Sequence, residues 1–141
     1  MAKRTASAVW NGDLKGGNGT VSVGSGLIKD AAYSFVSRFE EGTGTNPEEL
    51  VAAAHAGCFA MATSATFSKH GFNAERLAAT CTITLDTVDG KPTVTTSHLV
   101  LRGTVPGIDQ AKFAEIANEA KAGCPISRLL NATITLDATL E

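Results

Sequence analysis

Three cysteines and one histidine are the side chains of this sequence best able to carry covalent chemistry. Cys58 lies in the stretch "NPEELVAAAHAGCF" (46–59), three residues after His55, whereas Cys81 and Cys124 lie in separate segments. A cysteine thiolate can act as a nucleophile, a metal ligand or a redox group. Because the number of cysteines is odd, they do not form a complete disulfide framework. Each thiol is therefore an inert core residue, a metal ligand or a redox group.

Two of the cysteines have contrasting local sequences. Cys81 alternates with threonines on the same side as Ile83, and a free cysteine commonly serves as a small buried hydrophobic residue. Cys124 stands between Gly123 and Pro125, where the residue before proline leaves the helical conformation and proline favours the first helical turn. This places Cys124 at a helix N-terminus, which lowers the pKa of a thiol. Both a structural and a functional role are open for Cys124.

Cys58 lies among alanine, glycine and phenylalanine, which alone indicates a packed thiol with a raised pKa. Arg38, between Phe35 and Phe39, changes this interpretation, because an arginine in apolar surroundings needs an anion as partner. That anion could be Glu48, the Cys58 thiolate, or both. The alternative is an arginine that faces solvent on a strand.

His55 and Cys58 have the i, i+3 spacing of neighbours on one helical face. They could share a metal ion or form a thiol/imidazole pair, as in a Cys/His hydrolase. A metal site needs further ligands, and no other Cys/His cluster has suitable spacing, so we expect no metal ion. His70 and His98 are expected at the surface or at strand ends.

The elements that position these residues follow from alternation, turn residues and caps. The predicted elements, in chain order, are strands over 4–10, 19–24 and 27–36, a helix from Pro47 to Lys69 or His70, strands over 77–87 and about 93–105, a helix over 108–123, a short helix over 125–130 and a strand over 133–140. This order indicates an α+β fold rather than a parallel α/β repeat. With no internal repeat or linker, we expect one domain over residues 1–141.

The long helix has a well-marked start and an unusual composition. Asn46 is a good N-cap, Pro47 suits the first helical position, and Glu48 opposes the helix dipole. Glu48 and Cys58 are ten residues apart, or about 15 Å along the axis, and cannot touch each other. If Glu48 helps to build a site at Cys58, it does so for another subunit. Two such helices crossing near Ala53 in a two-fold dimer would give that arrangement.

Charge and hydropathy exclude several classes of partner. The net charge of −2, without long runs of either sign, does not indicate the basic surface that binds nucleic acid or an anionic membrane. Residues 50–68 carry no charge, but they are rich in alanine, serine and threonine and suit a protein-buried helix better than a membrane span. The N-terminal residues lack the apolar segment of a secretory signal, so we expect a cytoplasmic protein.

Two longer stretches resemble a known family: "RFEEGTGTNPEELVAAAHAGCF" (38–59) and "AKAGCPISRLLNATITLD" (120–137). Together they resemble the osmotically inducible protein C / organic hydroperoxide resistance family over nearly the whole chain. The pairing of "TNPEEL…C" with "GCP" 66 residues after Cys58 is more specific than either piece alone. The arginine shortly before the helix and the "AGCPIS" stretch look more like the osmotically inducible branch.

The resemblance implies a thiol peroxidase with no metal or bound cofactor. It implies an intertwined α+β homodimer in which antiparallel sheets wrap around two central buried helices. In this family, Cys58 would be the peroxidatic thiol and Cys124 the resolving thiol, although the helix-terminus argument alone favours Cys124 as the more acidic one. Arg38 would lower the pKa of the attacking thiol, and Glu48 would orient the guanidinium. Cys81 matches no family motif.

The implied reaction begins with thiolate attack on the O–O bond, which gives a Cys58 sulfenic acid and an alcohol. Cys124 then forms a disulfide with release of water, and an external dithiol, small or protein-borne, reduces the pair. The family implies a preference for organic hydroperoxides over hydrogen peroxide and a role in oxidative or osmotic stress. Candidates for an apolar wall around the substrate are Phe39, Phe59, Met61, Ile126 and Leu129. The alternative is a dimeric redox-sensing or ligand-binding protein without peroxide turnover.

Overall fold

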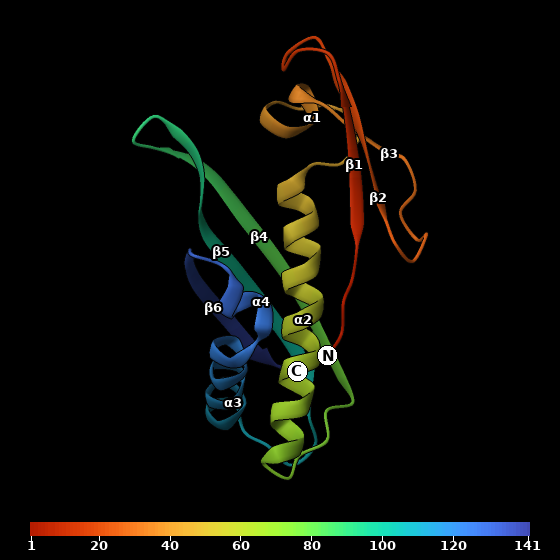
Figure 1. The fold of residues 1–141 in the computed structure, drawn as a ribbon. Helices are drawn as coiled ribbons and strands as arrows, with labels where there is room; N and C mark the ends of the chain where they lie inside the picture. Colours follow the sequence, from red (N-terminus) through yellow and green to blue (C-terminus); the bar gives the residue numbers. More distant parts are fainter. The chain divides into compact units, whose positions relative to one another are not determined.

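The strands of the protein form two separate three-stranded sheets (Figure 1). The computed structural model describes residues 1–141, and the chain divides into an N-terminal unit, Met1–Leu50, and a C-terminal unit, Val51–Glu141. The elements in chain order are β1 (Ala6–Asn11), β2 (Asn18–Val23), β3 (Ala31–Tyr33), α1 (Phe35–Phe39), α2 (Pro47–Lys69), β4 (Arg76–Val88), β5 (Lys91–Thr104), α3 (Gln110–Gly123), α4 (Pro125–Leu129) and β6 (Thr133–Leu140). The α+β class expected from the sequence is confirmed.

The N-terminal unit is an antiparallel sheet of order β1-β2-β3, followed by the short helix α1. Gly19 of β2 pairs with Trp10 on one side and Tyr33 on the other. The two aromatic rings lie 5.4 Å apart between centroids, and a Cβ on Gly19 would come within 2.5 Å of Tyr33 and 2.7 Å of Trp10. A glycine is therefore needed for these rings to meet across the sheet.

The predicted strand over 27–36 is much shorter in the structure, where β3 ends at Tyr33 and α1 begins at Phe35. Ser34 and Ser37 form a capping box: the Ser37 backbone N–H donates to Ser34 Oγ at 3.2 Å, and the Ser34 N–H donates to Ser37 Oγ at 2.8 Å. Such reciprocal caps start a helix even in a β-prone stretch. Arg38 therefore lies on a helix rather than on a strand.

Helix α2 has the limits that its caps predict. The Glu49 N–H donates to Asn46 Oδ1 at 2.8 Å, and Gly71, with φ of 84°, follows the last turn. The helix is long and apolar enough, by length and composition, to cross a membrane. It also buries Phe59, Phe67 and other side chains inside the fold, as the core helix of a soluble protein does.

The C-terminal unit is a sheet of order β4-β5-β6 with α3, α4 and residues 51–69 of α2 against one face (Figure 1). Strands β4 and β5 form an antiparallel hairpin through Asp89 and Gly90, which have φ of 51° and 74°. Positive φ at both central residues is the tight hairpin turn that Asp-Gly favours. The core contains, among others, Phe59, Phe67, Leu99, Leu101, Phe113 and Ile116.

One strand pairing corrects the antiparallel sheets implied by the family resemblance. Strand β6 runs parallel to β5, with Leu99 opposite Leu136, so this sheet is mixed. Parallel neighbours need a long crossover connection, usually helical, and α3 with α4 supply it. This crossover brings Cys124 to the helical side of the sheet, where its side chain is fully buried.

Candidate active site

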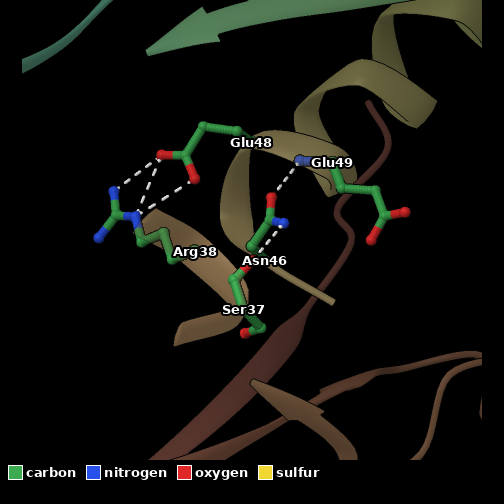
Figure 2. Close-up of polar contacts among 5 residues, drawn as sticks. All are labelled: Ser37, Arg38, Asn46, Glu48 and Glu49. Carbon is green, nitrogen blue, oxygen red and sulfur yellow. Dashed lines mark hydrogen bonds and ion pairs between the residues drawn. The ribbon is translucent and has the colours of Figure 1, made fainter. Parts of the chain in front are cut away.

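An arginine and a glutamate form a two-point ion pair in the N-terminal unit (Figure 2). Arg38 Nη2 donates to Glu48 Oε1 at 2.8 Å, and Arg38 Nε lies 3.2 Å from each carboxylate oxygen. The Glu48 side chain is 13% exposed and that of Arg38 36%. Two parallel contacts fix the plane of a guanidinium as well as its position. Glu48 is thus an anionic partner of Arg38, one of the alternatives that the sequence left open.

The local backbone explains why these two side chains meet. Asn46 caps α2 through its oxygen, and its Nδ2 donates to the backbone oxygen of Ser37 in α1 at 2.9 Å. This side chain therefore ties the start of α2 to the turn that carries Arg38. Figure 2 shows Glu49 directed away from Arg38, and its carboxylate instead accepts from Thr45 Oγ1 at 2.8 Å.

An apolar cavity lies beside Arg38. The Phe39 ring centroid is 5.1 Å from Arg38 Cζ, a distance suited to a cation–π interaction. The cavity has a volume of about 250 Å³ and is lined by Trp10, Leu14, Tyr33, Ser34, Phe35, Arg38 and Phe39. It therefore combines aromatic walls with one guanidinium that is already held in place.

Two thiols meet in the C-terminal unit. Cys58 of α2 and Cys124, the N-cap of α4, have their Sγ atoms 3.0 Å apart, with Cys124 donating to Cys58. Both are free thiols, Cys124 fully buried and Cys58 half-buried. A disulfide has an S–S distance of about 2.05 Å, so the pair needs an approach of roughly 1 Å to form one.

The surroundings of Cys58 disfavour its thiolate form. Burial raises the pKa of Cys58, and the hydrogen bond shared with Cys124 raises it further. The backbone N–H of Ile126, in the first turn of α4, acts in the opposite direction, and no cation contributes. The expected N-cap position of Cys124 is confirmed, but its thiol makes no cap hydrogen bond and contacts Cys58 instead.

His55 is fully buried and does not pair with Cys58. Its Nδ1 lies 2.6 Å from Ser97 Oγ and its Nε2 lies 2.7 Å from Ser127 Oγ. Both ring nitrogens are therefore occupied by hydroxyls, and burial lowers the pKa of His55. Cys81 Sγ contacts Ser97 Oγ at 3.2 Å and lies 3.8 Å from His55 Nδ1.

The roles of Ser97 and Ser127 were missed from the sequence, although a signal for each exists. Ser97 lies on the inward face of β5 together with Leu99 and Leu101, and Ser127 follows Cys124 by three residues, one helical turn. No group of three or more His, Cys, Asp or Glu side chains is placed to hold a metal ion.

The five candidate wall residues differ in their local surroundings. Phe39 lines the cavity beside Arg38, and Ile126 packs against the core with its backbone N–H directed at Cys58. Met61 and Leu129 are 77% and 73% exposed. Phe59 is completely buried in the core, and its place in a substrate-facing wall stays a prediction.

Comparison with known proteins shows the family of the chain. The family model described as "OsmC-like protein" matches residues 40–139, a range that includes Glu48, Cys58 and Cys124 and begins just after Arg38. The chain is 46% identical over 138 residues to the peroxiredoxin OsmC of Escherichia coli (strain K12), covering 98% of this chain and 96% of that protein. It is 30% identical over 102 residues to an organic hydroperoxide resistance protein of Xanthomonas axonopodis pv. citri (strain 306), covering 70% and 68%.

A solved structure with a similar fold is also named as an organic hydroperoxide resistance protein. A crystal structure of an organic hydroperoxide resistance protein OsmC from Legionella pneumophila matches with a TM-score of 0.72 and 25% identity, covering 99% of both chains. The higher identity to the OsmC protein than to the Xanthomonas protein agrees with the branch that the sequence motifs favoured. On the family model, the sequence identity and the fold together, the chain belongs to the OsmC-like protein family.

Proposed function

We propose that the protein is a cysteine-based peroxidase that reduces organic hydroperoxides to alcohols. The observation that carries this proposal is the pair of free thiols, Cys58 and Cys124, 3.0 Å apart at a buried position. The relatives reported above, named as a peroxiredoxin and as an organic hydroperoxide resistance protein, support the same activity.

The proposed cycle uses the two thiols in order. The Cys58 thiolate attacks one peroxide oxygen, the O–O bond breaks, and the other oxygen leaves as the alcohol after taking up a proton. Cys58 is then a sulfenic acid. The Cys124 sulfur attacks it, which forms the disulfide and releases water. A dithiol reductant returns both thiols and is itself oxidised to a disulfide.

Cys58 is proposed as the attacking thiol because it is half-buried, whereas Cys124 is fully buried. A peroxide can therefore reach the Cys58 thiol first, and the buried Cys124 thiol reacts in the second step. The raised pKa of Cys58 means that this thiol needs a cation to attack at neutral pH. Arg38, which Glu48 holds through two of its nitrogens, is the proposed cation. It would also stabilise the negative charge that develops on the leaving oxygen.

A homodimer is proposed to bring the ion pair to the thiols. Glu48 and Cys58 lie on one continuous helix, ten residues or about 15 Å apart along its axis. Between Leu50 and Ser68, the exposed residues of α2 are uncharged and mostly small, and they include Ala53, Gly57 and Met61. Two copies of α2 that cross antiparallel at this face would bring Glu48 and Arg38 of one protomer toward Cys58 of the other. The two units of each chain would then be parts of one domain, residues 1–141.

The cavity beside Arg38 and the charge of the chain bear on the substrate class and on the partners. The cavity beside Arg38, with Phe39 in its wall, suits a hydroperoxide with an apolar or aromatic group. The balanced surface charge, with a net value of −2, favours no nucleic acid and no anionic membrane as partner. We place the protein in the cytoplasm, where a dithiol reductant would keep its thiols free.

The test measures consumption of cumene hydroperoxide and hydrogen peroxide with a dithiol present. Wild type is compared with Cys58→Ser, Cys124→Ser and Cys81→Ser. We expect wild type and Cys81→Ser to turn over peroxide, with a preference for cumene hydroperoxide. Cys58→Ser and Cys124→Ser should lose this turnover. A wild-type protein that consumes neither peroxide would favour a redox-sensing or ligand-binding role instead.

A further inference from the structure

The buried histidine has no part in the proposed cycle, yet it joins the two elements that carry the thiols. His55 lies on α2 and Ser127 lies on α4, and they contact each other at 2.7 Å. We propose that His55 is a positioning residue that holds α4 through Ser127, so that Cys124 faces Cys58 for the disulfide-forming step. The inference rests on the proposed function for its place in the cycle.

The spacing of the four residues supports a two-point attachment. His55 precedes Cys58 by three residues, and Ser127 follows Cys124 by three residues. On a helix, residues three apart lie on the same face about one turn from each other. The contact between the thiols at 3.0 Å and the contact between His55 and Ser127 at 2.7 Å are thus two bridges between α2 and α4.

Helix α4 depends on such bridges because it is only five residues long, Pro125–Leu129. At its two ends, the Arg128 N–H donates to the carbonyl of the N-cap Cys124, and the N–H of the C-cap Leu130 donates to the Ile126 carbonyl, both at 3.0 Å. So short a helix is not stable by itself and takes its orientation from tertiary contacts. Ser127 is 9% exposed, and its hydroxyl is the side-chain group of α4 that reaches the imidazole.

The imidazole is in turn fixed to the sheet. Its Nδ1 contacts Ser97 of β5 at 2.6 Å, and Ser97 is fully buried. A neutral imidazole has one donor and one acceptor nitrogen, so the two serines can satisfy it in complementary roles. No buried side-chain polar atom in the structure is left without a partner. His55 is therefore held on one side by a strand and can act as an anchor for α4 on the other.

This arrangement separates the two chemical steps. Attack on the peroxide does not need Cys124, whereas disulfide formation needs Cys124 at the correct distance and angle from Cys58. Without the Ser127 contact, the sulfenic acid should persist longer. A second hydroperoxide molecule could then transfer an oxygen to it, giving a sulfinic acid and a second alcohol.

The test compares Ser127→Ala with Thr63→Val in single turnovers with cumene hydroperoxide. Thr63 is also fully buried on α2, but its hydroxyl donates only to the Phe59 carbonyl of the same helix, at 2.7 Å. Mass spectrometry with dimedone trapping follows the sulfenic acid and the disulfide separately. We expect Ser127→Ala to form sulfenic acid within about twofold of wild type and to form the disulfide about tenfold more slowly, as for the loss of one buried hydrogen bond. Thr63→Val should form the disulfide at the wild-type rate.

A second measurement needs no peroxide. Equilibration of the Cys58–Cys124 pair with dithiothreitol buffers should show an about tenfold shift toward the dithiol in Ser127→Ala, by the same reasoning. This titration decides the inference even if the wild type proves to have no peroxidase activity. Equal disulfide formation in Ser127→Ala and Thr63→Val, by rate and by equilibrium, would overturn it.

Two variants of similar shape at position 127 separate the loss of the hydroxyl from a general loss of folding. Ser127→Thr keeps the hydroxyl, and Ser127→Val has nearly the same shape without it. We expect the threonine variant to form the disulfide about tenfold faster than the valine variant. Equal rates in this pair would contradict the role of the hydroxyl contact.

Discussion

At the scale of single residues, the environment of Cys58 determines how the activity should depend on pH. Its pKa is raised by burial and by the contact with Cys124, and none of the groups that shift it is a cation. Since only the thiolate attacks, reactivity rises with pH through this pKa. A cation brought to the thiol would move that rise to lower pH. The proposed source is Arg38.

The Arg38→Met variant tests this directly. A nearby positive charge lowers a thiol pKa by about 1 to 3 units, and each unit is about tenfold in thiolate at neutral pH. We expect Arg38→Met to oxidise Cys58 at least about tenfold more slowly at pH 7 and to recover part of this rate at pH 9 to 10. The rate of Cys58 oxidation in Arg38→Lys should lie between the rates of the wild type and of Arg38→Met. A pH profile identical to the wild type would exclude Arg38 as the activating cation.

The adjacent glutamates provide a matched comparison. Glu48 accepts all three Arg38 hydrogen bonds, whereas the Glu49 carboxylate accepts from Thr45. Glu48→Gln removes a charge and one side of a bidentate pair, and we expect kcat/KM to fall about tenfold. Glu49→Gln removes the same charge one residue later and should stay within about twofold of wild type. Equal losses in the two variants would argue for a general effect of charge at the start of α2.

The lowered pKa of His55 predicts a pH dependence of stability. The unfolded chain protonates this histidine near its ordinary pKa of about 6.5, whereas the folded protein resists protonation to a lower pH. Stability is therefore complete above about pH 6.5 and decreases as the pH falls toward the folded pKa.

Urea unfolding of wild type and His55→Gln at pH 7 and pH 5 measures this effect. Glutamine can hydrogen-bond but does not titrate, and Cys81, the other nearby titratable group, has a raised pKa and stays neutral in this range. The loss of unfolding free energy between the two pH values should be smaller in the variant than in the wild type. An equal loss in both proteins would show that the titration of His55 does not contribute to stability between pH 7 and pH 5.

At the scale of secondary structure, local signals in the sequence were sufficient for most elements. Asn46, Pro47 and Gly71 defined the limits of α2, and Asp89 with Gly90 defined the β4–β5 turn. These signals act within a few residues, through caps and positive φ angles. The short helix α1 was missed because its start depends on two serine side chains in a stretch of β-forming residues.

The long-range relations could not be obtained in the same way. Alternation along β6 shows which face is buried but not the direction of its neighbour, so the parallel pairing with β5 was not expected. The ion pair of Arg38 with Glu48 was one of several alternatives for the arginine. Ser97 and Ser127 were missed because the inward face of the strand and the one-turn spacing indicate where each serine lies, but not which group its hydroxyl contacts.

Asn46 links the start of α2 to α1, and two substitutions separate its two contacts. Asn46→Ala removes both the cap to Glu49 N–H and the bond to the Ser37 carbonyl, and should destabilise the protein by about 1 kcal/mol. Asn46→Asp keeps the cap but loses the donor to Ser37. We expect its unfolding free energy to stay near the wild-type value while peroxidase activity falls, because the turn that carries Arg38 is released. Unfolding in urea and kcat/KM measure the two effects, and an aspartate variant with full activity would contradict the second.

At the scale of the whole molecule, the exposed face of α2 is the feature that a single chain leaves unexplained. Ala53, Ala54, Gly57 and Met61 are exposed on a 23-residue helix that carries no charge from Leu50 to Ser68. A Cβ added at Gly57 would meet nothing within 4 Å. Small residues allow two helices to approach closely, and burial of such a face in a two-fold interface would remove it from water.

Ala53→Glu tests whether this face is the interface that the activity requires. Ala111, on the exposed side of α3, gives the matched control Ala111→Glu, since both changes add one charged side chain to an exposed helical alanine. A buried and unpaired carboxylate would disfavour the dimer strongly, so we expect Ala53→Glu to elute as a monomer with peroxidase activity reduced at least about tenfold. Its Cys58–Cys124 pair should still equilibrate with dithiothreitol as in the wild type, because both thiols belong to one chain. Light scattering after gel filtration gives the masses, and an Ala53→Glu protein that remains dimeric and active would show that this face of α2 does not form the site.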